Sequence, residues 1–394
     1  MTRRIVSPHF ALLWGATFVF FLSFYLLLPA LPLYARTLGI PESQIGFIIG
    51  LFAVSSMVVK PVAGWAADRW GRKPLMLAGA ALFACSSALY GWSVTVAALL
   101  AVRLLHGAGM GLFPTASASM VADVAPAARR GEAMGLWGAA GNVALALGPL
   151  GAVWMADRWG FGWLFAISTA VALTALALTA ILRETLDTAV RLPFGFSSLL
   201  SPSVAFPCAI VFCLMTSYGL QAAFLPIYAQ SRGTNPGVFF LVLALVVAVV
   251  RGWAGQVSDR LGRAPVAATG MGLIAASLVT LAAGGGFGAL VAAGGLYGLG
   301  FGAAQPALMA WTVDLVRPTE RGKAMGTYYT ALELGIAAGA IGFGILLARS
   351  SFTVMFLAAA GLAGAGSGLS LIRISKARAG TAFGAAPPTV AREP

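Results

Sequence analysis

The chain has 394 residues, of which 59% are hydrophobic and 9% are charged, and its formal net charge is +13. Ordinary soluble domains carry about 25% charged residues, and a soluble fold cannot hide so much apolar surface, because surface falls too slowly with size. Nucleic-acid binding is also excluded, because the positive charges are scattered in short loops between apolar runs and form no basic helix or dense basic tail.

Twelve apolar segments are long enough to cross a bilayer as helices, which takes roughly 20 residues each. We place them at residues 8–34, 42–67, 74–92, 95–122, 131–157, 161–182, 203–229, 236–257, 264–284, 288–314, 322–348 and 352–372. Strands are excluded, because apolar and polar residues do not alternate and only helices or closed barrels satisfy their backbone in lipid. We therefore expect an all-α integral membrane protein whose first segment is a retained helix.

Lysine and arginine are distributed unevenly between the two sets of loops. With the N-terminus in the cytoplasm, the inside segments hold 18 of the 25 Lys and Arg residues and the outside segments hold 4. Because these residues collect on the cytoplasmic side, we expect both termini to be cytoplasmic, in a cell (inner) membrane of bacterial type. Lys60 and Arg251 lie within helices near their cytoplasmic ends, where snorkelling to the interface explains them.

A five-residue motif occurs twice in the chain. Residues 68–72, Asp-Arg-Trp-Gly-Arg, return 191 residues later as residues 259–263, Asp-Arg-Leu-Gly-Arg, and Asp123 and Asp314 stand at the same offset. The repeat predicts two like-oriented six-helix bundles that meet around a shared site, which is the architecture of a transporter. The expected organisation is a bundle at residues 1–183, a cytoplasmic linker at 184–202, a second bundle at 203–373 and a disordered cytoplasmic tail at 374–394.

These residues, with two further motifs, resemble the major facilitator superfamily. The segment Gly64-x-x-x-Asp68-Arg69-x-Gly71-Arg72-Lys73 resembles the family's signature loop between helices two and three, and its partner loop is matched by Asp259, Arg260, Gly262 and Arg263. Arg103-x-x-His106 resembles the helix-four motif. The helix-five motif of drug/proton antiporters is matched by Gly135, Ala144, Gly148 and Pro149, with Ala144 where glycine is usual. The resemblance covers nearly the whole chain and implies a twelve-helix secondary transporter.

The signature loop implies a gate on the cytoplasmic side. The family places the aspartate, here Asp68, against the N-terminus of helix eleven near Gly322, where unpaired N–H groups compensate an anion at a helix C-terminus. By analogy, Asp259 faces the start of helix five near Gly131. The alternative is a charge cluster that only sets the topology.

Three ionisable residues lie deep in the predicted helices and are the candidates for proton coupling. Glu333 lies roughly 16 Å from the cytoplasmic start of its helix at 1.5 Å per residue. It either carries a proton, pairs with a cationic substrate or hydrogen-bonds its neighbours. The charge of Arg103 costs at least ~2.5–3.5 kcal/mol at the bilayer centre. This cost favours a role in proton transfer or in organising the cavity, with snorkelling as the alternative. His106 is either a core residue or a proton carrier.

Aromatic and amide side chains on the helices that line the family's cavity are the substrate-binding candidates. They are Trp14, Tyr25, Trp137, Asn142, Tyr218, Gln221, Gln305, Tyr328 and Tyr329. An apolar lining with few polar groups suits amphipathic small molecules. The sequence holds no enzyme constellation and no P-loop, so we expect no catalysis, no use of ATP, no cofactor and no metal.

The expected function is proton-coupled efflux of a small, partly apolar compound by alternating access, performed by a monomer surrounded by membrane lipid. Its partners are then protons and a small-molecule substrate. One alternative is a proton symporter that imports a small nutrient such as a sugar or an organic acid. A second alternative is a non-transporting membrane receptor or assembly factor on the same fold.

Overall fold

A computed structural model describes residues 7–126, 129–186, 200–284, 286–317 and 320–382. Within these ranges the chain forms no strand, and twelve helices are long and apolar enough to cross a membrane. The helices are α1 (Pro8–Thr37), α2 (Glu42–Trp70), α3 (Arg72–Leu89), α4 (Val96–Val124), α5 (Arg130–Trp159), α6 (Phe161–Ile181), α7 (Ala205–Ser231), α8 (Gly237–Leu261), α9 (Arg263–Ala283), α10 (Phe287–Asp314), α11 (Arg321–Leu347) and α12 (Phe352–Ala382).

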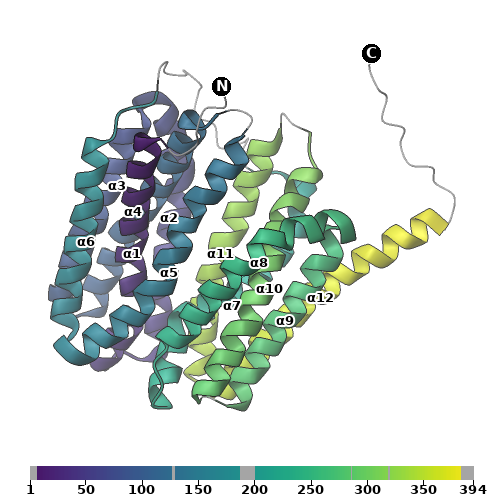
Figure 1. The fold of residues 1–394 in the computed structure, drawn as a ribbon. Helices are drawn as coiled ribbons and strands as arrows, with labels where there is room; N and C mark the ends of the chain where they lie inside the picture. The colour runs from purple at the N-terminus through teal and green to yellow at the C-terminus, as the bar shows by residue number, and fades with distance from the viewer. Residues whose placement is uncertain (1–6, 127–128, 187–199, 285, 318–319, 383–394) are drawn as a thin grey trace.

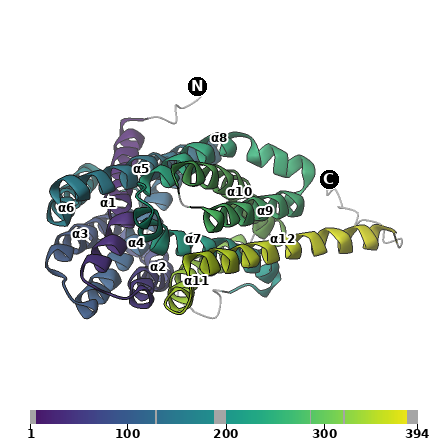
Figure 2. The same cartoon turned by 90° about the horizontal axis from the view of Figure 1, so that it is seen from below.

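The helices form two bundles, α1–α6 and α7–α12, which lie side by side (Figure 1 and Figure 2). Neighbours repeat from one bundle to the other: α1 packs on α5 and α2 on α4, as α7 packs on α11 and α8 on α10. Across the boundary, α2 contacts α11 and α5 contacts α8. The predicted fold class, twelve spanning helices in two bundles related by a parallel repeat, is therefore confirmed.

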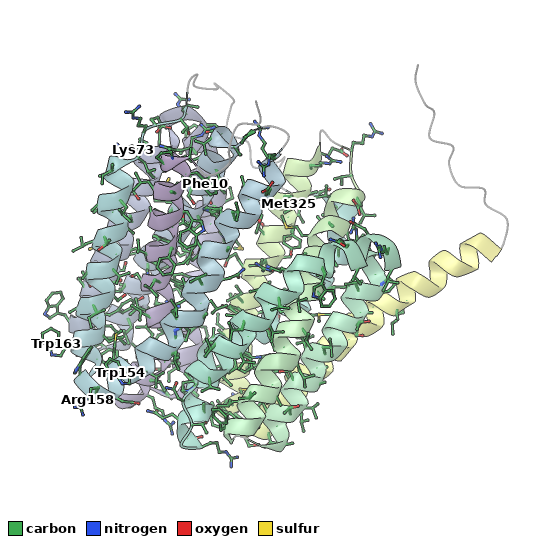
Figure 3. All side chains as sticks on the ribbon, viewed as in Figure 1. Phe10, Lys73, Trp154, Arg158, Trp163 and Met325 are labelled. Carbon is green, nitrogen blue, oxygen red and sulfur yellow. The ribbon has the colours of Figure 1, made fainter. Side chains whose placement is uncertain are left out.

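Both copies of the repeated motif lie at one end of the molecule, which we call the motif face. Figure 3 shows Lys73 and Met325 at this end, and Trp154 and Arg158 at the other end, which we call the opposite face. The helices that carry the site run between these two faces. We call the half of each helix that is nearer the motif face its motif half, and the half that is nearer the opposite face its opposite half.

The bundles touch most closely in the opposite half. A Cβ atom added to Gly46 of α2 would lie 2.3 Å from the carbonyl oxygen of Ala340 in α11, so only glycine permits this approach. Near the same face, the Arg36 guanidinium at the end of α1 donates to the carbonyl oxygen of Ile227 in α7 at 3.5 Å. These contacts close the boundary between the bundles at the opposite face.

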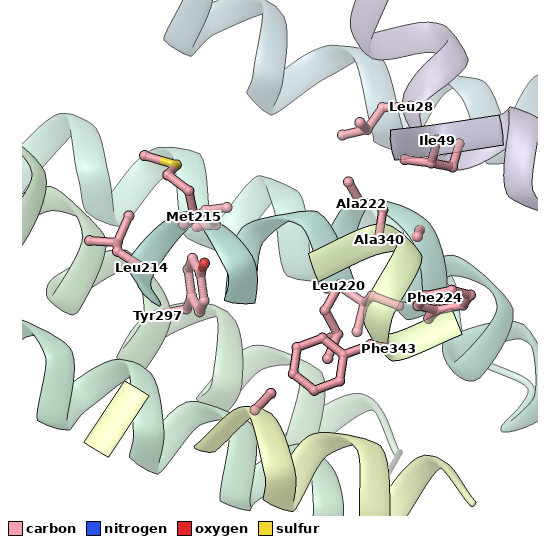
Figure 4. Packing of buried hydrophobic residues seen from close by; sticks show 14 of the residues in the cluster. Leu28, Ile49, Leu214, Met215, Leu220, Ala222, Phe224, Tyr297, Ala340 and Phe343 are labelled. Carbon is pink, nitrogen blue, oxygen red and sulfur yellow. The ribbon is translucent and has the colours of Figure 1, made fainter. Parts of the chain in front are cut away.

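The apolar core follows the same division. One cluster of buried side chains crosses the boundary, and Figure 4 shows Leu28 and Ile49 of the first bundle near Ala222 and Ala340 of the second. A separate cluster, which includes Phe20, stays within the first bundle. The first-bundle members of the shared cluster, such as Leu28, Ile45 and Ile49, lie in the opposite half, so the space between the bundles lies toward the motif face.

The structure corrects the expectation for the start of the tail. Disorder was expected from residue 374, but α12 continues to Ala382. The extension is rich in alanine and basic residues, which favour a helix once the preceding turns have formed. Composition alone indicates that this segment is too polar to form a core. It does not show that the preceding membrane-spanning helix continues into the segment. Most of the expected linker, residues 187–199, lies outside the described residues.

Candidate functional site

Each copy of the motif ends one helix and starts the next at a glycine in a left-handed conformation. Gly71, between α2 and α3, has φ 104°, and Gly262, between α8 and α9, has φ 93°. Side chains with a Cβ atom rarely adopt these angles, so glycine is required at both turns. The turns bring the arginine that follows each glycine back over the end of the preceding helix.

The following arginine organises the same ion-pair cluster in both bundles. Arg72 donates to the carbonyl oxygen of Ala67 at 2.8 Å and to Asp123 at 3.0 Å, and its guanidinium lies 3.2 Å from Asp68. Such a cluster joins the end of α2 to the end of α4. It therefore fixes how the helices of one bundle meet at the motif face.

In the second bundle, Arg263 repeats the two ion pairs. It lies 3.0 Å from Asp314 and 2.5 Å from Asp259. Because Asp123 and Asp314 are separated by the repeat offset of 191 residues, the sequence repeat is also a repeat of geometry. The same arginine thus joins α8 and α9 to the end of α10.

The aspartates of the expected gate are available to solvent. The side chains of Asp68 and Asp259 are 52% and 64% exposed, and each pairs with the arginine of its own copy. The expected latch partners are Gly131 and Gly322, and their contacts are not among the contacts that the structure describes. The latch therefore stays a prediction.

Two of the remaining gate residues make local contacts. Arg69 lies over the ring of Trp65 at 5.5 Å, and the Lys73 ammonium donates to the carbonyl oxygen of Ala180 at 2.7 Å. Arg260 is exposed, and a Cβ atom on Gly64 would meet nothing within 4 Å. Packing therefore gives no reason for glycine at position 64.

Glu184, which follows α6, caps the start of α3 and was not identified from the sequence. Its carboxylate accepts from the backbone N–H groups of Arg72 at 3.0 Å and Lys73 at 2.9 Å, which have no partner within the helix. Burial alone would raise the pKa of this carboxyl group. Hydrogen bonds from four backbone N–H groups nevertheless bring the pKa below its ordinary value.

We expect Glu184→Gln to lower the free energy of unfolding by about 1 kcal/mol, the usual cost of a lost helix cap. A lowered carboxyl pKa stabilises the folded state above the ordinary glutamate pKa, and this contribution disappears as pH falls through the folded value. Thermal unfolding of the two proteins should therefore differ at pH 7 and converge on acidification. Asp157→Asn, at an exposed carboxylate on α5, is the control; a constant difference across pH would contradict the capping role.

The helix-five motif packs α5 on α1. A Cβ atom on Gly148 would lie 2.6 Å from that of Tyr25, and Ala144 is fully buried. Two tryptophans join the same pair of helices: Trp14 donates to the carbonyl oxygen of Leu136 at 2.9 Å, and Trp137 donates to Thr17 at 3.2 Å. Pro149 lies within α5, and Gly135 lines a pocket described below.

Arg103 lies inside the first bundle and does not snorkel. Its guanidinium donates to the carbonyl oxygens of Ile48 at 3.0 Å and Ile49 at 3.3 Å, and it lies 4.4 Å from the centre of the Phe52 ring. With 4% of its surface exposed, it binds α4 to α2. This geometry fits a positioning role, because two of the partners are backbone carbonyls of the neighbouring helix α2. A further partner is the side chain of Tyr90, which also contacts His106.

His106 is enclosed by aromatic rings. Its Nδ1 atom lies 3.1 Å from the hydroxyl of Tyr90, its ring centre lies 4.1 Å from that of Phe83, and none of its surface is exposed. In the part of the chain that the structure describes, neither His106 nor Arg103 contacts Glu333. The three proton-coupling candidates are therefore not brought together.

Glu333 of α11 forms an ion pair with Lys60 of α2 across the boundary between the bundles. The Lys60 ammonium donates to the Glu333 carboxylate, and Ser56 donates to the same oxygen at 3.3 Å. The side chains are 8% exposed for Glu333 and 26% for Lys60. The snorkelling interpretation of Lys60 is therefore wrong: at this depth a carboxylate on the facing helix attracts the ammonium more strongly than it would in water.

A pocket of about 390 Å³ lies beside this ion pair, between α2, α4, α5 and α11. Trp137 and Tyr329, two of the expected cavity residues, line it together with Lys60. The Lys60 ammonium lies 5.8 Å from the centre of the Tyr329 ring. A mostly apolar space thus lies beside the Lys60–Glu333 ion pair. Among the described residues, this is the one ion pair between the two bundles.

Arg251 of α8 forms the corresponding contact with α5, so its snorkelling interpretation is also wrong. Its guanidinium donates to Gln305 at 2.6 Å and to Asn142 at 3.4 Å. A second pocket, of about 590 Å³, lies between α5 and α8 and is lined by both Asn142 and Arg251. We call this space the α5–α8 pocket.

The other expected cavity residues are distributed through the second bundle. Tyr328 donates to the backbone carbonyl oxygen of Gln305 at 3.3 Å, and the ring of Tyr218 lies 6.0 Å from that of Phe301. Gln221 is 1% exposed, and both polar atoms of its amide have no hydrogen-bond partner among the described residues. Neither Tyr218 nor Gln221 lines the two pockets.

Comparison with known proteins places these features in a family. The family model described as the Major Facilitator Superfamily matches residues 13–256 and 208–390. An uncharacterized MFS-type transporter of Methanocaldococcus jannaschii is 25% identical over 349 residues, which cover 85% of this chain and 90% of that protein. Multidrug resistance protein 2 of Bacillus subtilis is 30% identical over 179 residues, which cover 45% of this chain and 44% of that protein.

A solved structure has the same overall fold. The crystal structure of a nucleoside transporter superposes with a TM-score of 0.81 at 14% identity and covers 93% of this chain and 99% of its own. At this low identity the similarity concerns the fold and carries no information about the compound that is bound.

Proposed function

The chain belongs to the Major Facilitator Superfamily, and on that premise we propose that it exports a small, partly apolar compound in exchange for protons. It is a multi-pass membrane protein and a transporter of this family. The proposal adds the coupling ion, the direction and the kind of compound. It rests above all on the ion pair between Lys60 and Glu333, which joins the two bundles within the membrane-spanning region.

Protonation of Glu333 removes the charge that holds Lys60. Removing one partner of a buried ion pair costs about 3–5 kcal/mol, because the other charge is left without compensation. A proton on Glu333 therefore weakens a bond between α2 and α11. In exchange for the compound, the proton reaches Glu333 while the space between the bundles is open at the opposite face, and it leaves toward the motif face, where the bond with Lys60 forms again.

Moving one charge across the membrane is worth ~2.3 kcal/mol per 100 mV, so the entry of one proton can drive a modest concentration gradient of the compound outward. The apolar pockets beside Lys60 and Arg251 suit a compound with an apolar body and few polar groups.

Three features favour export. The charge bias of the loops favours a cytoplasmic motif face in a bacterial-type inner membrane, so the space between the bundles would load from the cytoplasm. The helix-five motif resembles that of drug/proton antiporters. A relative matched over 45% of this chain carries the name multidrug resistance protein 2.

The direction can be tested without knowing the compound in advance. Purified protein is placed in liposomes that contain the pH-sensitive dye pyranine, and aromatic cations, neutral compounds and anions are added outside. An antiporter releases protons as the compound enters, so the lumen becomes alkaline for at least one class. The Glu333→Gln variant should give no such response.

Two other outcomes would count against the proposal. Acidification of the lumen that depends on Glu333 would indicate the nutrient symporter. A folded protein that moves no protons with any compound class would favour a receptor or an assembly factor.

A further inference from the structure

The repeat builds the same contact twice between the bundles, but with a different charge. Lys60 and Arg251 are separated by the repeat offset of 191 residues, and so are Asn142 and Glu333. In the structure Lys60 pairs with Glu333, and Arg251 donates to Asn142 at 3.4 Å. The acceptor is thus a carboxylate at the α2–α11 boundary and a neutral amide at the α5–α8 boundary.

The positive charge of Arg251 therefore has no counter-charge from the described part of the chain. Both of its partners there, Asn142 and Gln305, are neutral amides, and no carboxylate lies within ion-pair distance. A guanidinium has five N–H donors, and these two bonds use only part of them. A cation in a membrane-spanning helix is costly unless it is paired, so an anion from outside the protein would stabilise it.

The space around Arg251 suits an apolar molecule that carries this anion. Arg251 is exposed and lines the α5–α8 pocket, whose volume of about 590 Å³ lies in the range for small-molecule sites. The walls consist of small and aliphatic side chains, such as Gly138, Ala139 and Ala248. Apart from Arg251, the one polar side chain in the lining is that of Asn142.

We propose that the α5–α8 pocket binds an amphipathic organic monocarboxylate, with its carboxylate on Arg251 and its apolar body against α5 and α8. Arginine suits this task because its planar N–H groups match the two oxygens of a carboxylate. The inference rests on the proposed transport function and specifies its substrate class. It also separates two tasks, since Arg251 holds the compound while Glu333 carries the proton.

Three naphthalene compounds of similar size test the charge preference on the full-length protein in a neutral detergent. They are the anion 1-naphthoate, the neutral 1-naphthalenemethanol and the cation 1-naphthylmethylammonium. Ligands that bind the folded state raise its melting temperature. We expect 1-naphthoate to raise the melting temperature most. A larger rise with the cation, or no rise with the anion, would overturn the proposal.

Variants locate the effect. Arg251→Gln should weaken 1-naphthoate binding by about tenfold or more, the loss typical of hydrogen bonds to a charged group. Arg251→Lys, which keeps the charge but loses the two-pronged geometry, should lie between Arg251→Gln and the wild type. Arg349→Gln removes the same charge from an exposed loop and should bind as the wild type does.

Asn142→Glu provides the sharpest variant, because it gives Arg251 the carboxylate that its counterpart Lys60 already has. It should fold at least as stably as the wild type and lose 1-naphthoate binding by about tenfold. Undiminished binding in both Asn142→Glu and Arg251→Gln would show that the site lies elsewhere. Stabilisation by phosphatidylglycerol, without any by 1-naphthoate, would assign Arg251 to a lipid instead.

The two proposals can fail separately. Binding of 1-naphthoate reports on Arg251 and requires no proton movement. The proton response that depends on Glu333 is measured with all three compound classes. A chain that exchanges protons for cations would keep the proposed function and lose the carboxylate site.

Discussion

Exchanging the charges of Lys60 and Glu333 is expected to restore the proton response that each single reversal abolishes. Lys60→Glu places two carboxylates side by side between α2 and α11, and Glu333→Lys places two ammonium groups there. Losing such a pair costs about 3–5 kcal/mol, and every 1.4 kcal/mol is a factor of ten. Each single variant should therefore lose about 100-fold or more of the compound-driven proton flux.

The double variant Lys60→Glu/Glu333→Lys keeps one carboxylate and one ammonium across the same boundary. It should recover to within about tenfold of the wild type, since some bond geometry is lost with the swap. The control is the exposed pair Arg129 and Glu132, whose side chains are 41% and 51% exposed, because surface ion pairs contribute about 0–1 kcal/mol. A folded double variant as inactive as the single ones would show that the proton does not act through this pair.

The number of helices and the relation between the two bundles could be predicted from the sequence. An apolar run of sufficient length specifies a spanning helix whatever surrounds it, and the repeat at 191 residues specifies the relation between the bundles. Helix ends were less predictable where the next segment also favours a helix, as α12 shows by continuing to Ala382.

The partners of the charged residues could not be predicted from single positions. The sequence shows that Glu333 is a carboxylate deep in a helix. For Lys60 it shows only the distance from the helix end, and that distance does not tell which helix the side chain faces. The missed signal was the combination of two pairs at the same offset, Lys60 with Arg251 and Asn142 with Glu333. A cation and an acceptor at matching places in both bundles indicate one contact formed twice.

Arg103 illustrates the reverse difficulty. Its depth in the membrane indicates a function, but two of its partners are the backbone carbonyl oxygens of Ile48 and Ile49. Backbone groups leave no trace in the pattern of side chains. A charged residue that binds a neighbouring helix through such groups therefore cannot be distinguished, in the sequence, from one that faces the cavity.

The glycine at position 46 is expected to determine how readily the opposite face closes. In the closed arrangement, a Cβ atom at this position would lie 2.3 Å from the carbonyl oxygen of Ala340 and 3.4 Å from Gly344 of α11. Gly46→Ala must therefore separate the two helices there, and overpacking of this kind costs about 1–3 kcal/mol. The arrangement open at the opposite face does not have this contact, so the equilibrium should shift toward it by about 5–150-fold.

Two other glycines separate this effect from general damage. Gly64→Ala, in the same helix, meets nothing within 4 Å and should leave the equilibrium unchanged. Gly219→Ala would place a Cβ atom 2.1 Å from the carbonyl oxygen of Ile336, within the second bundle, and should lower stability without favouring either arrangement. Hydrogen exchange of residues 42–50 measures the opening. If Gly46→Ala exchanged there no faster than Gly64→Ala, the packing of α2 on α11 would not control access at this face.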